Sequence, residues 1–375
     1  MRDVVILGAS MKRFGRYEES IIKMGADCCL DALRDAGVPW KNINAAYCSH
    51  VMMGVTVGQS VLMPLGPTGI PIFNVDNGCA GGTTAMILAR QAIQAGSFDV
   101  VLIVGVQKMP KGVLGPEIVD LPEADQTQRD MGLLSLPSKY AMIARRHMEL
   151  YGTTAEQLAR VSVKNHKHGS LNPYSQHQRE FTLDEVLGSR MISDPLTLYQ
   201  CAPTGDGVAA LVLCADEVAS KYACKKPIKM AGAALCSQVY VPDDPTDIHA
   251  YTTKAAKEAY EMAGCGPEDI DVIELHDCFS IAEICHYENL GLCPKGEGGR
   301  LIDEGTTELG GRIPVNTSGG LLSRGDPTGA TGLAQIVEIV WQLRGEAYNR
   351  QVPDAKVGLT QNLTGLASSV LILMR

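Results

Sequence analysis

A cysteine among glycines marks the start of an expected helix near residue 79. The stretch from Asp76 to Met86 reads DNGCAGGTTAM, a polar loop that runs into a helix-forming segment. A thiol at a helix N-terminus lies among free backbone N–H groups and at the positive end of the helix dipole, which lowers its pKa toward the reactive thiolate. The same N–H groups can hold the oxyanion formed when a thioester carbonyl is attacked. We interpret Cys79 as a nucleophile; the alternative is a buried cysteine that only packs.

A histidine and a second cysteine follow an expected strand at residues 270–275. The chain there reads His276-Asp277-Cys278-Phe279. Catalytic loops of α/β folds gather beyond the carboxyl ends of strands. His276 offers a hydrogen-bond donor for an oxyanion, and Cys278 offers a second thiol for acid–base work. A lone histidine at such a place is more often structural, so the pair carries the functional interpretation.

Composition excludes several classes of protein. The net charge of −9 and the pI near 5.4 leave no basic stripe for nucleic acid. The longest apolar runs, such as 100–104 and 370–374, are far too short to span a membrane. Residues 4–7 read as a buried strand rather than a signal peptide, so we expect a cytoplasmic protein. The twelve cysteines include no C-x-x-C pair, so we expect no metal site and mostly small buried thiols.

Strand and helix signals alternate along the chain, which predicts an α/β architecture. A helix over 20–36, a Gly37 stop and a strand over 43–50 have a counterpart in a helix over 254–263, a break at Gly264 and a strand over 270–275. Two Gly-rich loops also open helices, one at Cys79 and one over 318–332. This repetition favours two similar halves, although any two βα pairs can share such a unit by chance.

The stretch from 111 to 190 interrupts the alternation and is richer in polar residues, tyrosine and histidine. We interpret it as an inserted loop or lid domain. The expected organisation is an N-terminal half of 1–110 and 191–222, the lid of 111–190, and a C-terminal half of 223–375.

Several motifs in order along the chain resemble those of the thiolase superfamily, in its branch of sterol-carrier-protein-type thiolases and lipid-transfer proteins. The resemblance runs from residue 4 to the C-terminus. It rests on NGCAGG around Cys79, HDCF at 276–279, GEGGRLIDEGTTELGGRIPVNTSGG ending at Gly320, GDPTGATG at 325–332, SDPLTLYQCAPTGDGVAA at 193–210 and the closing QNLTG at 361–365.

The resemblance implies a duplicated five-layer αβαβα fold with an inserted lid and a homodimer or dimer of dimers. Cys79 becomes acylated in such enzymes, His276 binds the thioester oxygen and Cys278 shuttles the proton. Asn316, Ser318 and Gly319 match the loop that shapes the cleft. Coenzyme A is expected as a substrate, with no tightly bound cofactor. Some relatives work with a small zinc-ribbon/OB-fold subunit, so the resemblance allows such a partner for this chain.

Asp326 departs from the family pattern. The usual motif is Gly-His-Pro-x-Gly-Ala-Thr-Gly, and its histidine activates the nucleophile and donates to the oxyanion; this chain has Gly325-Asp326-Pro327. An ionised Asp only accepts hydrogen bonds, and near Cys79 it opposes thiolate formation. Three outcomes stay open: Asp326 turned away and paired with Arg324, Asp326 as general base toward Cys79, or a subunit that has lost thiolysis.

The C-terminal loop departs too, since relatives carry His-Asn and a Gly-x-Gly-Gly turn where this chain has QNLTGLA at 361–367. Gly365 is a candidate for the missing backbone donor. His166 and His168 read as a solvated helix end, with phosphate contact as the alternative. His147 with Arg145 and Arg146 forms a basic cluster that either meets a coenzyme A phosphate or is a solvated face.

The expected function is an acyl-CoA C-acyltransferase that cleaves a 3-oxoacyl-CoA through an acyl-cysteine, or runs the reverse Claisen condensation. Two alternatives remain: an acyl-CoA retro-aldolase of the lipid-transfer type, and a non-catalytic subunit that binds acyl-CoA.

Overall fold

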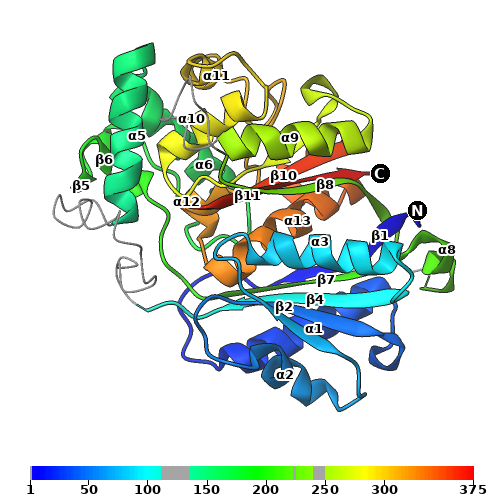
Figure 1. The fold of residues 1–375 in the computed structure, drawn as a ribbon. Helices are drawn as coiled ribbons and strands as arrows, with labels where there is room; N and C mark the ends of the chain where they lie inside the picture. Colours follow the sequence, from blue (N-terminus) through cyan, green and yellow to red (C-terminus); the bar gives the residue numbers. More distant parts are fainter. Residues whose placement is uncertain (1, 111–134, 223–224, 240–249) are drawn as a thin grey trace.

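The computed structural model describes residues 2–110, 135–222, 225–239 and 250–375. Five layers stack on one another: α9 (Ala250–Ala263) and α10 (Ser280–Asn289), a half-sheet, α3 (Gly81–Gln94) with α13 (Thr328–Arg344), a second half-sheet, and α1 (Ile21–Ala36) with α2 (Val57–Leu62) (Figure 1). The expected αβαβα arrangement is confirmed.

The two half-sheets form one mixed sheet of nine strands in the described part of the chain. The N-terminal half has the order β3-β2-β4-β7-β1, and the C-terminal half continues as β8-β11-β10-β9. Two residue pairs between β1 and β8 join the half-sheets. The strands are β1 (Val4–Met11), β2 (Ala45–Ser49), β3 (Ile72–Val75), β4 (Val100–Gln107), β7 (Gly207–Ala215), β8 (Ile228–Ser237), β9 (Val272–Glu274), β10 (Val357–Thr364) and β11 (Ala367–Met374).

The halves repeat one plan, as the sequence predicts. β1, β2, β4 and β7 of the first half correspond in order to β8, β9, β10 and β11 of the second. The edge strand β3 corresponds to an isolated parallel bridge between Ile273 and Val315. Helix α1 ends before left-handed Gly37, and helix α9 ends before left-handed Gly264.

The packing of helix on strand repeats as well. A Cβ on Gly8 of β1 would lie 2.2 Å from the Ala32 carbonyl oxygen of α1, and a Cβ on Gly232 of β8 would lie 2.3 Å from the Ala259 carbonyl oxygen of α9. Both glycines therefore let the helix backbone approach the strand more closely than any side chain permits.

The predicted insertion holds α5 (Leu136–Tyr151), α6 (Ala155–Ser170) and α7 (Leu183–Leu187) among its described residues, and the short strands β5 (Met191–Ser193) and β6 (Leu196–Thr197) follow it directly. Residues 111–134 of the predicted lid lie outside the described residues. α5 and α6 share one hydrophobic cluster with the outer face of the C-terminal half-sheet, through Tyr140, Leu158 and Val161 among others. The described part of the insertion is thus packed onto the C-terminal half.

The remaining α-helices of the described residues are α8 (Asp216–Ala219), α11 (Gly298–Asp303) and α12 (Gly320–Arg324). One hydrophobic cluster fills the middle layer around α3 and α13, and separate clusters fill the two outer layers. Among the helices that the structure describes, none has the length and apolar character to cross a bilayer.

Candidate active site

Three predicted side chains converge from three separate loops. The ligand-type atoms of Cys79, His276 and Asp326 all lie within 4.8 Å of one another. Cys79 precedes α3, His276 follows β9 and Asp326 precedes α13, so both halves of the fold contribute. The duplication places the N-termini of the two central helices next to each other, which is why residues far apart in the chain can meet.

A tight turn holds Cys79 in place. Gly78 adopts a φ of +53°, and its N–H donates to the Asp76 side chain at 3.1 Å. The Asn77 amide donates to the Thr84 hydroxyl of α3 at 2.9 Å. Cys79 remains partly exposed.

The structure overturns the expectation that the helix start lowers the pKa of Cys79. Burial and the Asp326 carboxylate instead raise the pKa of this thiol well above its usual value, against the lowering effect of its own backbone N–H. The predicted opposition between Asp326 and a thiolate is confirmed. Cys79 is therefore a neutral thiol in the folded chain.

Two side chains of β10 fix the His276 loop. The His276 backbone N–H donates to Gln361 Oε1 at 3.0 Å, and the Asn362 amide nitrogen lies 3.3 Å from His276 Nδ1. The same amide nitrogen also donates to Gln335 Oε1 at 2.9 Å, which fixes its orientation. His276 Nδ1 must then accept, so the ring proton sits on Nε2.

This tautomer suits a hydrogen-bond donor and not a metal ligand. The Nδ1 lone pair is engaged by Asn362, and Nε2 carries the proton. Metal-binding histidines instead donate from their second nitrogen to an acceptor. Burial also lowers the pKa of His276, which keeps the ring neutral. The protonated Nε2 of His276 therefore offers a proton, and no free lone pair, on the side of Cys79 and Asp326.

Asp326 faces this cluster and is anchored by Thr331, whose hydroxyl donates to Asp326 Oδ1 at 2.7 Å. The first of the three outcomes considered for Asp326 is wrong, because Arg324 pairs with a different carboxylate. Arg324 is fully buried, and its Nη1 lies 3.3 Å from Glu274 Oε2 and 3.2 Å from Ser318 Oγ. The first outcome paired Arg324 with Asp326. Arg324 instead pairs with Glu274 at the end of β9, a residue that was not predicted from the sequence.

Cys278 lies buried beside the cluster, close enough for the charges of Asp326 and Cys79 to act on it. Burial raises the pKa of the Cys278 thiol, and Tyr140 of α5 acts against this rise. The Tyr140 ring stacks on Phe279 with centroids 4.6 Å apart. Tyr140 belongs to no motif, so no signal in the sequence could have identified it.

The loop at 316–319 contacts the segment just before His276 and does not line the site itself. Asn316 adopts a φ of +55°, accepts a hydrogen bond from the Leu275 N–H at 2.9 Å and donates to Glu283 at 2.7 Å. These contacts hold the backbone directly before His276.

The second part of this loop is fixed by Glu274. Ser318 donates to both oxygens of Glu274, from its N–H at 2.9 Å and from its hydroxyl at 2.6 Å. Gly319 adopts a φ of +98°, and a Cβ there would lie 2.7 Å from the Gly169 Cα. Asn316, Ser318 and Gly319, which were predicted to shape the cleft, therefore position the loop of His276.

Gly365 is exposed in the turn between β10 and β11, with no atom within 4 Å of its Cβ position. The preceding residue, Thr364, lies close to the turn before Cys79. A Cβ on Gly78 of that turn would lie 2.7 Å from Thr364 Oγ1. No contact of the described residues brings Gly365 itself to Cys79.

The predictions for the histidines of α6 need correction. His166 and His168 are buried, not a solvated helix end. His168 Nδ1 contacts the Asn316 carbonyl at 3.0 Å, and its Nε2 accepts from the Leu309 N–H at 2.9 Å. The packing of α6 against the loop of Asn316 accounts for the difference, because both ring nitrogens of His168 find backbone partners there.

The predicted basic cluster on α5 needs correction as well. His147 is buried and contacts Thr153 and Glu288, whereas Arg145 and Arg146 are exposed. The three side chains point to different surroundings, so a single basic cluster at 145–147 does not form.

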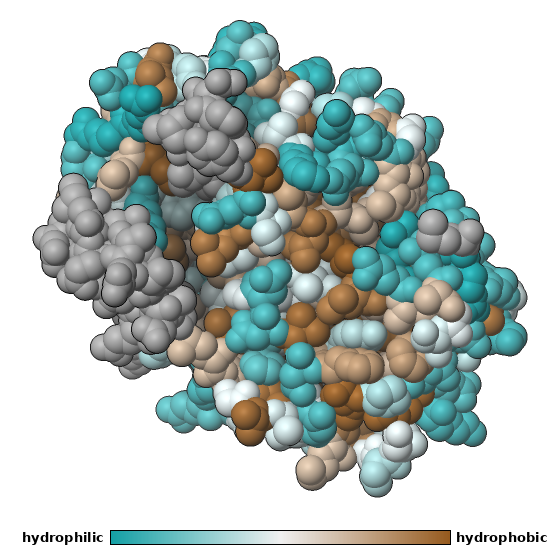
Figure 2. Space-filling model, viewed as in Figure 1, coloured by the Kyte–Doolittle hydropathy of each residue, from teal (hydrophilic) through white to brown (hydrophobic). Residues whose placement is uncertain are grey.

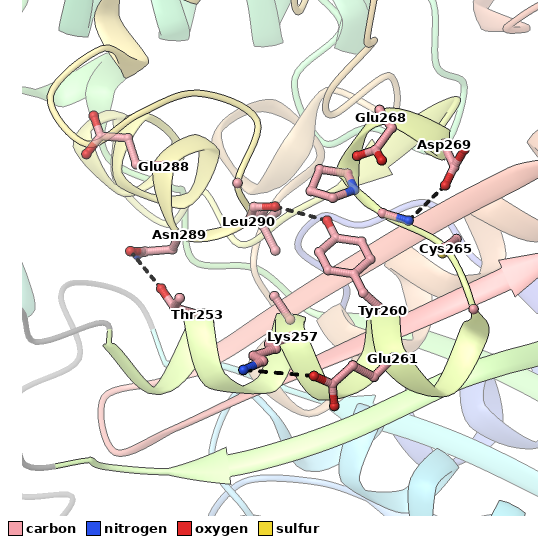
Figure 3. A pocket seen from close by; sticks show the side chains of 15 residues that line it. Thr253, Lys257, Tyr260, Glu261, Cys265, Glu268, Asp269, Glu288, Asn289 and Leu290 are labelled. Atoms are coloured by element: carbon pink, nitrogen blue, oxygen red, sulfur yellow. Dashed lines mark hydrogen bonds and ion pairs between the residues drawn. The ribbon is translucent and has the colours of Figure 1, made fainter.

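A surface hollow of about 670 Å³ lies away from these residues, between α9 and the end of α10 (Figure 3). Its lining includes Tyr260, whose hydroxyl donates to the Leu290 carbonyl at 3.0 Å.

Hydrophobic side chains gather across the middle of the face shown in Figure 2. The exposed large apolar residues include Phe73 of β3 and Leu88 of α3.

Comparison with known proteins agrees with this geometry. A family model described as "Thiolase, N-terminal domain" matches residues 4–217, and one described as "Thiolase C-terminal domain-like" matches residues 233–375. Sterol carrier protein 2 of Oryctolagus cuniculus is 42% identical over 98% of this chain and 71% of its own length. An acetyl-CoA acetyltransferase of Methanothermobacter thermautotrophicus is 41% identical over 99% of both chains.

Among solved structures, the "Ltp2-ChsH2(DUF35) aldolase" aligns with a TM-score of 0.88 and 28% identity, over 99% of this chain and 97% of that one. The two family models together span both halves of the fold and every residue of the cluster around Cys79. The chain belongs to the thiolase family.

Proposed function

We propose that the protein is an acyl-CoA C-acyltransferase that cleaves a 3-oxoacyl-CoA with coenzyme A, or runs the reverse condensation. The observation that carries this proposal is the convergence of Cys79, His276 and Asp326 within 4.8 Å. The left-handed turn at Gly78 precedes the nucleophile, and the cysteine stays partly exposed. A thiol, a hydrogen-bond donor and a carboxylate thus share one accessible place.

In the first half-reaction, the Cys79 thiol adds to the 3-oxo carbon while the Asp326 carboxylate takes its proton. This route fits a thiol whose raised pKa keeps it neutral until it attacks. The tetrahedral oxyanion then re-forms a carbonyl, and the bond between the α and β carbons breaks. The acyl group stays on the sulfur, and the electron pair passes to the α carbon as an enolate of the shorter acyl-CoA.

The protonated Nε2 of His276 donates to the enolate oxygen, and Cys278 gives its proton to the α carbon. In the second half-reaction, the thiol of coenzyme A attacks the acyl-cysteine. Its proton restores the Cys278 thiol, and the proton on Asp326 returns to the departing Cys79 sulfur. Atoms and charges then balance over the cycle.

Intact-mass measurement after incubation with an acyl-CoA tests the proposal. Wild-type protein should gain the mass of one acyl group, and Cys79→Ala should gain none. Cys265→Ala is the matched control, because Cys265 is also partly exposed but lies just beyond the end of α9. An adduct that persists in Cys79→Ala, or saturable coenzyme A binding without any adduct in the wild type, contradicts the proposal.

A retro-aldolase is the second candidate, because the structural neighbour at a TM-score of 0.88 is described as an aldolase. In that reaction Asp326 removes the proton of a β-hydroxyl group, and Cys79 forms no covalent bond. The two candidates separate by product: a retro-aldolase releases an aldehyde or ketone from a 3-hydroxyacyl-CoA, and Cys79→Ala retains most of that activity.

The proposed partners draw support from the same comparisons and from the surface. The aldolase neighbour contains a DUF35 partner, which supports a small partner subunit for this chain as well. The position of β3 at the edge of the described sheet and the exposed Phe73 support a homodimer formed at that edge. Light scattering on the purified chain should give twice the monomer mass, and Phe73→Asp should shift it toward the monomer.

A further inference from the structure

We infer that Gln335 of α13 is a positioning residue that determines, through Asn362, which ring nitrogen of His276 carries the proton. The meaning of this role for catalysis rests on the proposed function, but the hydrogen bonds themselves do not. The helix that follows Asp326 then contributes twice to the site, because its interior also controls the neighbouring histidine.

The chain of hydrogen bonds begins at a backbone carbonyl of β10, which can only accept. Gln335 Nε2 donates to the Gln361 carbonyl at 3.1 Å. Gln335 has no exposed surface, so bulk water does not compete for either end of its amide. Since the amide nitrogen faces Gln361, the amide oxygen Oε1 must face the other way, toward Asn362.

The orientation of Gln335 fixes that of Asn362. Gln335 Oε1 can only accept, so the Asn362 atom that lies 2.9 Å from it must be the amide nitrogen. The same nitrogen lies 3.3 Å from His276 Nδ1 and has a second hydrogen to donate there. If Asn362 turned over, two carbonyl oxygens would face each other in a buried place, which is unfavourable. His276 Nδ1 therefore accepts, and the ring proton lies on Nε2.

Gln361 connects these side chains to the backbone of the same histidine. Its side-chain Oε1 accepts from the His276 N–H at 3.0 Å, and its Nε2 donates to the Ser368 hydroxyl at 3.1 Å. The carbonyl and the side chain of Gln361 are thus both engaged. One residue of β10 holds the backbone of His276 directly and its ring through Gln335 and Asn362.

The position of the proton matters because the ring of His276 is neutral. Burial lowers the pKa of His276, so only one of its two nitrogens carries a proton. A proton on Nε2 lets His276 donate to the enolate oxygen of the proposed mechanism. A proton on Nδ1 would leave a lone pair on Nε2, and the ring would then act as a base. Gln335 and Asn362 thus select between two chemistries of one side chain.

The tautomer can be measured by ¹⁵N NMR of protein labelled at its histidines, whether or not the enzyme is active. The unprotonated ring nitrogen is recognised by its large downfield shift, and the His276 signals are assigned by their loss in His276→Gln. At a pH of about 8, above the ordinary histidine pKa, Nδ1 should be the unprotonated nitrogen in the wild type. A proton on Nδ1 in the wild type overturns the inference.

Two variants should change the tautomer. Asn362→Asp places a carboxylate, which can only accept, beside Nδ1, so Nδ1 should become protonated. Gln335→Met removes both polar ends of the amide, so Asn362 is free to turn over and both tautomers should be populated. Gln335→Glu is the conservative variant, because it keeps an oxygen that accepts from Asn362, and it should retain the wild-type tautomer. An unchanged tautomer in either Asn362→Asp or Gln335→Met overturns the inference.

Gln342→Met is the matched control, because Gln342 is a buried glutamine of the same helix with different partners. Its amide nitrogen donates to Thr317 Oγ1 at 3.1 Å and to the Arg350 carbonyl at 2.8 Å. This variant should leave the His276 tautomer unchanged. A mixture of tautomers in Gln342→Met as well means that any disturbance of α13 has this effect, and it overturns the assignment to Gln335.

The catalytic consequence is measured separately, as exchange of the α protons of acetyl-CoA in D₂O. Exchange should slow about 10²-fold in Asn362→Asp, the loss expected for one donor to an oxyanion, while the KM for acetyl-CoA stays the same. Gln335→Glu should exchange at close to the wild-type rate. Normal exchange in Asn362→Asp overturns the inferred link to catalysis. Absence of exchange in the wild type counts against the proposed thiolase function instead, and the NMR measurement still decides the role of Gln335.

Discussion

The Asp326 carboxylate lies within 4.8 Å of the Cys79 sulfur, and the Thr331 hydroxyl donates to its Oδ1 at 2.7 Å. A carboxylate at this distance opposes formation of a thiolate but can accept the proton of an attacking thiol. In the proposed mechanism the same residue thus keeps Cys79 neutral at rest and supplies its base. Family members with histidine at this position combine a base with a hydrogen-bond donor, which an ionised Asp326 does not provide.

Asp326→His should therefore raise the rate of thiolysis, by about tenfold, because an imidazole removes the like charge and can also donate to the oxyanion. Formation of the shorter acyl-CoA, followed by chromatography, measures the rate. Asp326→Asn is the control, since it has a similar shape but is not a base, and should be about 10²–10⁴-fold slower than wild type. An unchanged or lower rate in Asp326→His means that Asp326 belongs to a different mechanism.

His166 and His168 should each contribute a loss of stability as the pH drops below about 6.5, where a histidine of the unfolded chain begins to bind a proton. Burial lowers the pKa of His166 and of His168 to about 3 in the folded chain. The unfolded state therefore gains protons between about pH 6.5 and pH 3 while the folded state does not. The free energy of unfolding should decrease by about 1.4 kcal/mol per pH unit for each histidine in that window.

His168→Gln tests this assignment, because a glutamine amide can donate to the Asn316 carbonyl and accept from the Leu309 N–H without titrating. Urea unfolding between about pH 5 and pH 7, across the ordinary histidine pKa, measures how the free energy of unfolding changes with pH. In His168→Gln this slope should be smaller than in wild type by the contribution of one histidine. Lys167→Gln, an exposed neighbour on α6, should leave the slope as in wild type. Equal slopes in His168→Gln and wild type contradict the prediction.

Arg324→Met should destabilise the protein by about 3–5 kcal/mol, because it removes the cationic partner of Glu274, a carboxylate with no exposure. Chemical denaturation measures the loss. The double variant Arg324→Met/Glu274→Gln should recover part of it, since no charge is then left buried. If the double variant loses the sum of the stability lost in Arg324→Met and in Glu274→Gln, the ion pair is not the cause of the destabilisation.

Gly8→Ala and Gly232→Ala should destabilise the protein to a similar extent, by about 1–3 kcal/mol each. Each added Cβ meets a helix carbonyl oxygen at 2.2 or 2.3 Å, so the helix must move away from its strand. Thermal unfolding measures both. Gly365→Ala is the control, because nothing lies within 4 Å of its Cβ position. A large loss at only one of the two packed glycines argues against equivalent halves.

The repeated pattern of helix, glycine and strand is local, so it could be predicted before the chain was folded. The end of α1 at Ala36 and of α9 at Ala263 follows from the glycine after each helix, whose left-handed conformation stops the helix. The motifs around Cys79, His276 and Asp326 likewise predicted that these loops carry the chemistry. Each of these signals lies within a few residues of the feature it describes.

The environment of the same residues could not be read from the chain, because burial and electrostatic effects depend on groups distant in sequence. The local helix start predicted a lowered pKa for Cys79, but burial and the distant Asp326 raise it. Arg324 is a near neighbour of Asp326 in the chain, yet it pairs with Glu274. His168 was predicted to be solvated, and the contact of α6 with the loop of Asn316 buries it.

The residue types at the turns and helix starts are enough to specify the duplicated α/β fold and the three reactive loops. The protonation of Cys79 and the tautomer of His276 depend instead on the folded chain. Backbone conformation is set largely by neighbours along the chain, whereas desolvation, charge and side-chain hydrogen bonds are set by neighbours in space.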